Sequence, residues 1–164
     1  MSTLYVDSIE PKTTGGIIGI PTQIAFDVSR ISSGAEGVNQ VIVFNHVTTN
    51  VGNAYNPSNG RFTAPVSGTY EFSHTAFGAG NTGASAVASS VALKAFFRKN
   101  GSATTTTKYG FMYSYIQAIS YPNISSKTIL TLAQNDYIEV YYDAYYMYVD
   151  TAMTNNFTGK LIGG

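Results

Sequence analysis

Four carboxylates in the C-terminal part of the chain are the residues whose type and spacing come closest to those of a metal-binding site. They are Asp136, Glu139, Asp143 and Asp150. Clustered carboxylate oxygens are the ligands that calcium prefers. The twelve-residue loop of a known calcium motif is absent, however, so a calcium site stays an open alternative. We expect no metal site and no cofactor.

A second motif with possible chemistry is the glycine pattern GAGNTG at residues 78–83, which follows a strand-like segment. A dinucleotide site would need a helix next and an acidic residue ~20 positions further on. The segment 97–100 at that distance reads FRKN and holds no acid, and residues 87–97 alternate as in a strand. We therefore interpret 78–83 as a glycine-rich loop between strands.

The sequence shows no recognisable set of catalytic residues. His46 and His74 are the two histidines, and neither shares a motif with a second ligand or a nucleophile. No pair of carboxylates resembles a glycosidase site. The chain has no cysteine, which excludes disulfides and thiolate metal sites. We expect a protein that is not an enzyme, with each histidine hydrogen-bonded or facing solvent.

Tyrosine is the residue type that remains for function. The chain holds 13 tyrosines and no tryptophan, and tyrosine is enriched at interfaces because it joins an apolar ring to a hydroxyl. Alternation in 137–142 predicts one strand face with Ile138, Val140 and Tyr142 and another with Tyr137, Glu139 and Tyr141. The candidate interface or ligand surface consists of Tyr137, Tyr141, Tyr145, Tyr146 and Tyr148. The alternative is that most tyrosines belong to the core or to a seam between subunits.

The composition is low in charge. Only 11% of the residues are charged and the net charge is zero, which argues against nucleic acid and anionic membranes as partners. So few charges predict that much of the surface is buried in an assembly. No apolar run approaches the ~18 residues of a membrane span, and the start lacks a signal-peptide core. We expect no membrane insertion.

The segment 44–72 organises the chain. It reads FNHVTTNVGNAYNPSNGRFTAPVSGTYEF, in which aromatic residues alternate with clusters of Asn, Gly, Pro and Ser. This pattern is typical of short strands joined by tight turns. Residues 69–73 alternate polar and aromatic side chains, so one face of that strand is expected to be buried. Gly68 is expected in a tight turn.

The spacing in this segment resembles the C1q/TNF-like domain. The matching positions are Phe44, Asn50, Tyr55, Phe62, Gly68, Tyr70 and Phe72, and His74 stands where the family has an aromatic residue. Phe157 and Gly159 resemble the closing strand of that family. The resemblance covers residues 22–162 and implies an all-β, C1q/TNF-like jelly-roll sandwich of about ten antiparallel strands. It also implies a homotrimer, and calcium binding occurs in some members.

The first 21 residues form a separate region. Residues 1–21 are expected to be an anchoring arm with apolar anchors at Leu4, Val6 and Ile9, and 22–164 the jelly-roll domain. The opening MSTLYVDSIEPKTTGG resembles the N-termini of tail-fibre and other virion proteins of tailed bacteriophages. An ordinary N-terminal strand is the alternative interpretation of this opening.

Together these resemblances indicate a structural virion protein of a tailed bacteriophage, made in the cytoplasm of the bacterial host. The favoured hypothesis is a trimeric tail-fibre or tip knob that binds a host surface glycan or protein, with its arm on another virion protein. A capsid decoration, head-fibre or adaptor protein is the second hypothesis. A bacterial C1q-like carbohydrate-binding adhesin is the third.

Overall fold

A computed structural model describes residues 23–31, 34–36, 39–77, 91–102, 104, 107–116, 123–144, 147–149 and 155–163. Within these ranges the chain forms strands, turns and bends, and no helix. Several sequence predictions fall outside the described residues. These are the arm with Leu4, Val6 and Ile9, the glycine loop at 78–83, and Tyr145, Tyr146 and Asp150.

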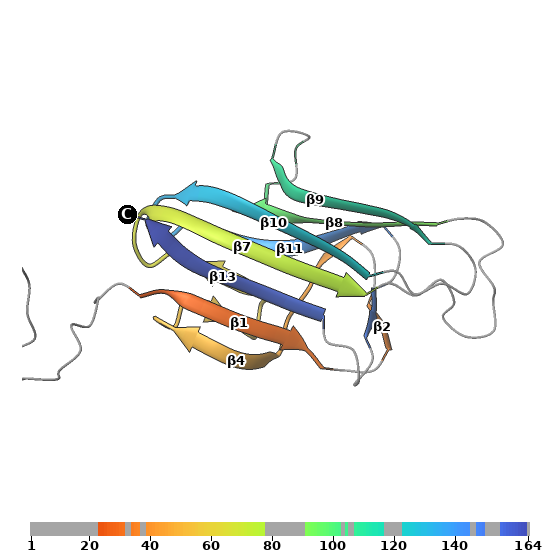
Figure 1. Ribbon diagram of the computed structural model, residues 1–164, viewed down its shortest axis with the longest axis horizontal. Helices are drawn as coiled ribbons and strands as arrows, with labels where there is room; N and C mark the ends of the chain where they lie inside the picture. Colours follow the sequence, from red (N-terminus) through yellow and green to blue (C-terminus); the bar gives the residue numbers. More distant parts are fainter. Residues whose placement is uncertain are drawn as a thin grey trace, which may run out of the picture.

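Two antiparallel sheets pack face to face (Figure 1). The first sheet has the order β10 (Asn123–Leu132), β7 (Gly68–Phe77), β13 (Asn155–Gly163), β1 (Ala25–Arg30) and β4 (His46–Val51). The second has the order β5 (Tyr55–Asn56), β6 (Arg61–Thr63), β11 (Tyr137–Ala144), β8 (Val91–Lys99) and β9 (Lys108–Ile116), with β3 (Gln40–Val41) also paired to β11. A small third sheet pairs β12 (Met147–Val149) with β2 (Gly34–Glu36).

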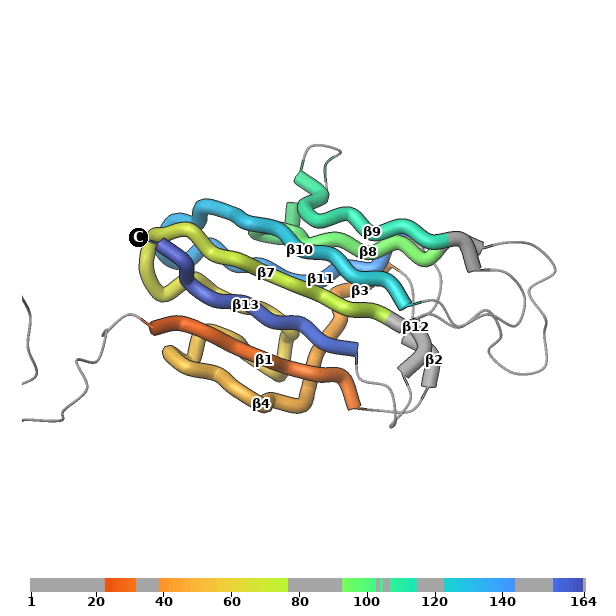
Figure 2. Tube along the Cα trace, viewed as in Figure 1, coloured from red at the N-terminus to blue at the C-terminus, as the bar shows by residue number. Residues whose placement is uncertain are grey.

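Neighbouring strands in each sheet are mostly distant in sequence. β7 lies between β10 and β13, and β11 lies between β6 and β8. At one side of the sandwich β9 runs beside β10, so the edges of the two sheets meet there (Figure 2). The expected all-β sandwich is confirmed, and its two main sheets hold five and six strands.

The core between the sheets is built from aromatic rings. Phe26, Phe62, Phe72 and Phe157 are all buried, and the ring of Phe26 contacts the other three with centroids 4.8–6.4 Å away. The alternation in β7 directs Tyr70 and Phe72 into this core, as the sequence pattern predicts. Full burial of one such side chain is worth about 1.5–3 kcal/mol. The core therefore fixes the register of both sheets.

The spacing of Phe44, Asn50 and Tyr55 has a specific structural cause. The amide of Asn50 accepts a hydrogen bond from Tyr55 N at 3.1 Å and donates to Tyr55 O at 2.9 Å. The buried hydroxyl of Tyr55 donates to the carbonyl of Phe44 at 3.0 Å. These bonds hold β4 against β5, which joins an edge of the first sheet to an edge of the second.

Gly68 and Gly159 have different structural roles. Gly68, expected in a tight turn, is instead the first residue of β7, pairs with Leu132, and follows a bend at 65–67. Gly159 is required by close packing, because a Cβ atom there would meet ring atoms of Phe26 and would lie 2.6 Å from Cδ1 of Phe72. The glycine in the closing strand thus makes room for the aromatic core.

Two asparagines adopt the left-handed backbone that their turns need. Asn100 and Gly101 have φ of 52° and 72°, and Ser102 N donates to Lys99 O at 3.0 Å, as in a type I′ turn. The β8–β9 pairing resumes only at Arg98 and Lys108, so this turn opens a longer loop than a two-residue hairpin. Asn135 has φ of 71° in the turn that precedes β11.

Candidate recognition surface

A row of charged residues crosses the outer face of the second sheet. Arg61 on β6, Glu139 on β11, Arg98 on β8 and Lys108 on β9 are consecutive partners in the strand registers. They face away from the core because their neighbours in the strands, such as Phe62, Ile138 and Phe97, point into it. Four strands therefore each contribute one charged residue to this row.

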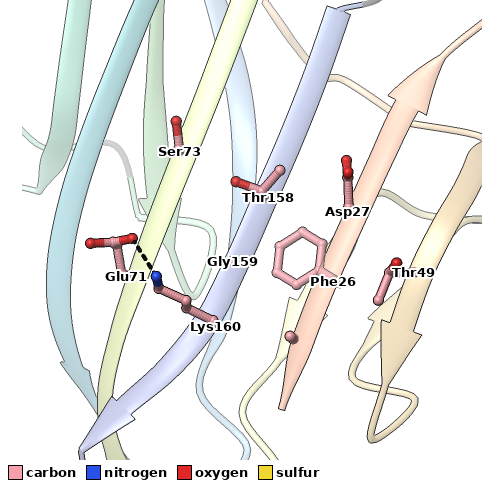
Figure 3. A pocket seen from close by; sticks show the side chains of 9 residues that line it. Phe26, Asp27, Thr49, Glu71, Ser73, Thr158, Gly159 and Lys160 are labelled. Atoms are coloured by element: carbon pink, nitrogen blue, oxygen red, sulfur yellow. Dashed lines mark ion pairs between the residues drawn. The ribbon is translucent and has the colours of Figure 1, made fainter. Parts of the chain in front are cut away.

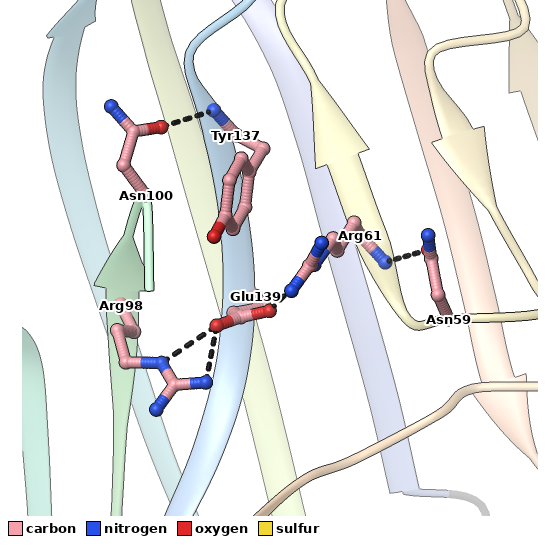
Figure 4. Close-up of polar contacts among 6 residues, drawn as sticks. All are labelled: Asn59, Arg61, Arg98, Asn100, Tyr137 and Glu139. Carbon is pink, nitrogen blue, oxygen red and sulfur yellow. Dashed lines mark hydrogen bonds and ion pairs between the residues drawn. The ribbon is translucent and has the colours of Figure 1, made fainter. Parts of the chain in front are cut away.

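Glu139 is the centre of this row and is fully buried (Figure 4). Its Oε1 accepts from Nε of Arg98 at 2.6 Å, and its Oε2 accepts from Nε of Arg61 at 2.9 Å. A second contact joins Arg98 Nη2 to Oε1 at 2.5 Å. The carboxylate is thus hydrogen-bonded on both sides by guanidinium groups, the arrangement that a buried charge requires.

Tyr137 and Tyr141 lie on either side of Glu139 along the same face of β11. The guanidinium of Arg61 sits 4.3 Å from the ring centroid of Tyr137, and that of Arg98 sits 4.2 Å from the ring of Tyr141. Such cation–π contacts are worth roughly 0.5–2 kcal/mol each. The predicted separation of the two β11 faces is confirmed, since Ile138, Val140 and Tyr142 are buried in the core.

The Arg61–Tyr137 pair is further fixed by backbone contacts from two turns. The side chain of Asn100 accepts a hydrogen bond from Tyr137 N at 2.9 Å. The side chain of Asn59 accepts from Arg61 N at 3.1 Å (Figure 4). The backbone of each residue in this pair is therefore held in place by an asparagine side chain.

Aromatic residues continue this face toward β9. Phe96 is buried outside the main core, where its ring lies 5.6 Å from Tyr141 and 6.3 Å from Phe111. Phe111 is 49% exposed and Tyr113 is 45% exposed. Phe96 faces outward by the ordinary alternation of β8, since Ala95 and Phe97 on either side of it face the core.

Basic side chains outnumber acidic ones on this face. The basic residues are Arg61, Lys94, Arg98 and Lys108, and the acidic ones are Glu139 and Asp143. Lys108 pairs with Asp143 at 2.8 Å and lies 4.7 Å from the ring of Phe96. The hydrogen bond to Glu139 raises the pKa of Arg61 above its usual value, so this guanidinium stays charged. We call the surface formed by Arg61, Arg98, Glu139, Tyr137, Tyr141, Phe96 and Phe111 the aromatic–arginine face.

Three of the four carboxylates considered for a calcium site lie within the described residues, and each of these is engaged by a cation. Glu139 is bound by two arginines, and Asp143 is bound by Lys108. Asp136 pairs with Lys99 at 2.7 Å and accepts from Asn100, which lowers the pKa of Asp136 to about 2. Within the described ranges no three acidic or histidine residues gather as a metal site would need. The described ranges also contain no helix able to cross a membrane.

The outer face of the first sheet is different in character. It carries an open hollow of about 250 Å³ lined by residues of β1, β4, β7 and β13, among them Phe26, Asp27 and Glu71 (Figure 3). Glu71, which lines this hollow, pairs with Lys127 at 2.7 Å and with Lys160 at 3.3 Å, and these lysines, Lys127 above all, lower the pKa of Glu71. Asp27 accepts a hydrogen bond from Asn156. Positive and negative groups are balanced on this face.

The histidines have the roles expected of polar residues outside a catalytic site. His46 is exposed on β4. His74 is fully buried and donates from Nδ1 to the carbonyl of Asn156 at 2.8 Å, while its Nε2 lies 3.4 Å from the hydroxyl of Tyr142. Burial lowers the pKa of His74 to about 4, so the ring is neutral near pH 7. His74 occupies the aromatic position of the strand by packing edge-on against Phe44.

Only part of the surface predicted from tyrosines is assembled by the described residues. Tyr137 and Tyr141 lie together on the aromatic–arginine face, whereas Tyr148 is in β12 of the small sheet. Sequence reasoning missed Arg61, Arg98 and Phe96, because they meet only through strand register. A local signal was present in the adjacent pair Phe96–Phe97, which breaks the alternation of that strand.

Comparison with known proteins places this fold and its motif in one family. A family model described as C1q domain matches residues 25–162. The chain belongs to this family. C1q-like domains are generally recognition or structural modules that are not enzymes, and they typically form homotrimers and bind ligands.

Individual relatives agree with this assignment. The chain is 41% identical over 59 residues to a human complement C1q subcomponent, and 40% identical over 63 residues to its mouse counterpart. These matches cover 36% and 38% of this chain but only 23% and 25% of the relatives' length. The chain therefore matches a minor part of each complement protein.

Solved structures confirm the fold. The globular domain of zebrafish complement 1qA protein has a TM-score of 0.65 at 18% identity, over 85% of this chain and 97% of that domain. Murine APRIL has a TM-score of 0.62 at 8% identity, over 86% of this chain and 100% of its own. At these identities the likeness shows the C1q/TNF-like jelly-roll fold.

Proposed function

We propose that this chain is a recognition knob of a tailed-bacteriophage virion, a homotrimer that binds the host surface at a tail fibre or tip. The observation that carries the binding role is the aromatic–arginine face, which combines exposed aromatic rings with fixed guanidinium donors. Aromatic residues and arginine are the residue types most enriched at binding surfaces. No described group offers an activated nucleophile beside this face, so binding is the function it supports.

The distribution of exposed apolar residues supports a ring-shaped oligomer. Val47 and Val51 are 39% and 46% exposed on β4, at one edge of the first sheet. Ile129 on β10, at the opposite edge, is 57% exposed. Two different apolar edges on one molecule suit a head-to-tail interface, which gives a ring when the rotation between neighbouring subunits closes. The low charge of the chain agrees with extensive burial.

The placement on a virion rests on the sequence of the arm. Residues 1–16 resemble the start of bacteriophage tail-fibre and virion proteins, and Leu4, Val6 and Ile9 offer apolar anchors. An extended segment of this kind can add a strand to an exposed sheet edge of another virion protein. In this proposal the arm attaches the knob, and the second sheet faces outward to the host.

Immunogold labelling of virions with antibodies against the purified knob tests this function. Label at the tail fibre or tip, together with binding of the purified knob to host cells, is the expected result. Label over the head contradicts the tail position and favours a capsid decoration or adaptor protein. Label on bacterial surfaces without virions contradicts the virion role and favours an adhesin.

A further inference from the structure

The guanidinium of Arg61 is held in place but has unused hydrogen-bond donors. Its Nε donates to Glu139, and its plane lies over the ring of Tyr137. The side chain is nevertheless 40% exposed, and its two terminal amino groups make no hydrogen bond to the described residues. Because the stem and Nε are fixed, the edge that carries both terminal nitrogens is presented to solvent.

An exposed guanidinium edge of this type matches a carboxylate. The two terminal nitrogens can donate two parallel hydrogen bonds to the two oxygens of one acid group. Fixing the donor before binding reduces the loss of side-chain entropy that accompanies binding of a ligand. The hydroxyls of Tyr137 and Tyr141, which make no hydrogen bond to the described residues, lie on the same face.

We propose that Arg61 and Tyr137 form a subsite for the carboxylate of an acidic glycan, such as a uronic or sialic acid residue in a bacterial surface polysaccharide. The acid group binds the terminal nitrogens of Arg61, and the hydroxyl of Tyr137 bonds to a neighbouring sugar hydroxyl. Glu139 acts as a positioning residue that holds Nε of Arg61. This inference rests on the host-binding function proposed above and specifies its ligand.

The charge distribution favours this face over the opposite one. On the first sheet's outer face Lys127 and Lys160 share Glu71, and Asp27 supplies a second negative charge, so that face is balanced. On the second sheet, Glu139 is shared by two arginines, so one positive charge of that triad is left without a partner. An anion therefore gains more from the second sheet than from the first.

A glycan fits this face better than a nucleic acid does. The row of charges spans only four strands, and Asp143 pairs with Lys108 at one end of it. The chain has zero net charge, whereas nucleic-acid binding depends on neutralising many phosphates. An isolated carboxylate on a neutral sugar backbone needs one fixed guanidinium and adjacent hydroxyl partners, which this face provides.

Isothermal titration of the protein, residues 1–164, with defined oligosaccharides tests the proposal. The probes are hexagalacturonate and hexasialic acid, with neutral cellohexaose and a single-stranded DNA oligonucleotide as comparisons. The variant Arg61→Gln should weaken binding of an acidic hexasaccharide by roughly tenfold or more. Arg61→Lys keeps the charge but loses the paired donors, so it should restore only part of the affinity. Lys127→Gln, an exposed cation on the first sheet, is the matched control and should bind as the unaltered protein does.

Each outcome of these measurements either supports or overturns the proposed subsite. Failure of the unaltered protein to bind either acidic hexasaccharide, equal binding of cellohexaose, tighter binding of DNA, or full affinity in Arg61→Gln overturns the subsite. Host-cell binding, measured in parallel, distinguishes failure of the carboxylate subsite from failure of the host-binding function. If cells are bound equally by Arg61→Gln and the unaltered protein, the subsite fails and the host-binding function stands. If the unaltered protein binds no cells, the host-binding function fails.

Discussion

Arg98 and Glu139 face each other across β8 and β11, with Nε of Arg98 2.6 Å from a carboxylate oxygen that is buried from solvent. The aromatic rings of Tyr137 and Tyr141 flank this carboxylate, and Arg61 contacts its other oxygen. Because this carboxylate is buried, water cannot take the place of an arginine that is removed from it. The ion pair therefore contributes to the order of the whole outer face.

Removal of Arg98 should destabilise the protein more than removal of an exposed lysine. Arg98→Met leaves Glu139 buried with only Arg61, and loss of one partner of a buried pair costs about 3–5 kcal/mol. We expect the lower end of that range because Arg61 remains. The control Lys127→Met breaks an exposed pair with Glu71, and exposed ion pairs contribute little to stability. Urea unfolding measures both, and equal losses in the two variants would contradict the role of Glu139.

The strand faces could be predicted from the sequence, but the contacts between strands could not. Alternation within residues 137–142 is a local property, so it separates Tyr137, Glu139 and Tyr141 from the core residues correctly. The position of Arg61 opposite Glu139 depends on a register between strands 78 residues apart in sequence. Glu139 therefore suggested a calcium ligand from its neighbours along the chain, whereas its neighbours across the sheet are arginines.

The Gly159 position predicts a sharp contrast between two glycines of one strand. Gly159→Ala places a Cβ against Phe26 and Phe72, both fixed in the core, and overpacking of this kind costs about 1–3 kcal/mol. Gly163→Ala is the control, since a Cβ there meets nothing within 4 Å. Thermal unfolding should show a clear loss for Gly159→Ala and little change for Gly163→Ala. Similar melting temperatures for the two variants would argue against the tight packing at Gly159.

Acid should destabilise the fold through His74. The unfolded chain binds a proton on this residue below about pH 6.5, whereas the folded state keeps the ring neutral until about pH 4. The unfolded state therefore binds more protons in this window, and the free energy of unfolding falls as the pH is lowered from 6.5 to 4. The slope for one group reaches about 1.4 kcal/mol per pH unit.

His74→Phe tests the origin of this acid dependence. The variant keeps an aromatic ring against Phe44 but cannot be protonated, so its stability should vary less between pH 6.5 and 4.5. Asp136, whose pKa is lowered to about 2, contributes its own loss at lower pH and does not obscure this window. Urea unfolding at several pH values measures the slope. An unchanged slope in His74→Phe would assign the acid dependence to other groups.

Truncation of the aromatic core should prevent folding. Phe62 and Phe72 are fully buried, and Phe→Ala in a core costs about 3–5 kcal/mol. That loss is comparable to the whole stability of a small domain. We expect Phe62→Ala and Phe72→Ala to be insoluble, whereas Phe111→Ala, at an exposed ring, should fold. Normal thermal melting of Phe62→Ala or Phe72→Ala would contradict the assignment of the core.

Deletion of residues 1–20 should separate attachment from folding. All strand pairs and core contacts that the structure describes lie between residues 23 and 163, so the truncated chain keeps every one of them. We expect a soluble trimer with an unchanged melting temperature that no longer joins the virion, since the arm supplies the proposed anchors Leu4, Val6 and Ile9. Sedimentation measures the oligomeric state, and electron microscopy of virions assembled with the truncated protein measures attachment. If the deletion abolishes the trimer, the arm belongs to the knob itself and the anchoring hypothesis is wrong.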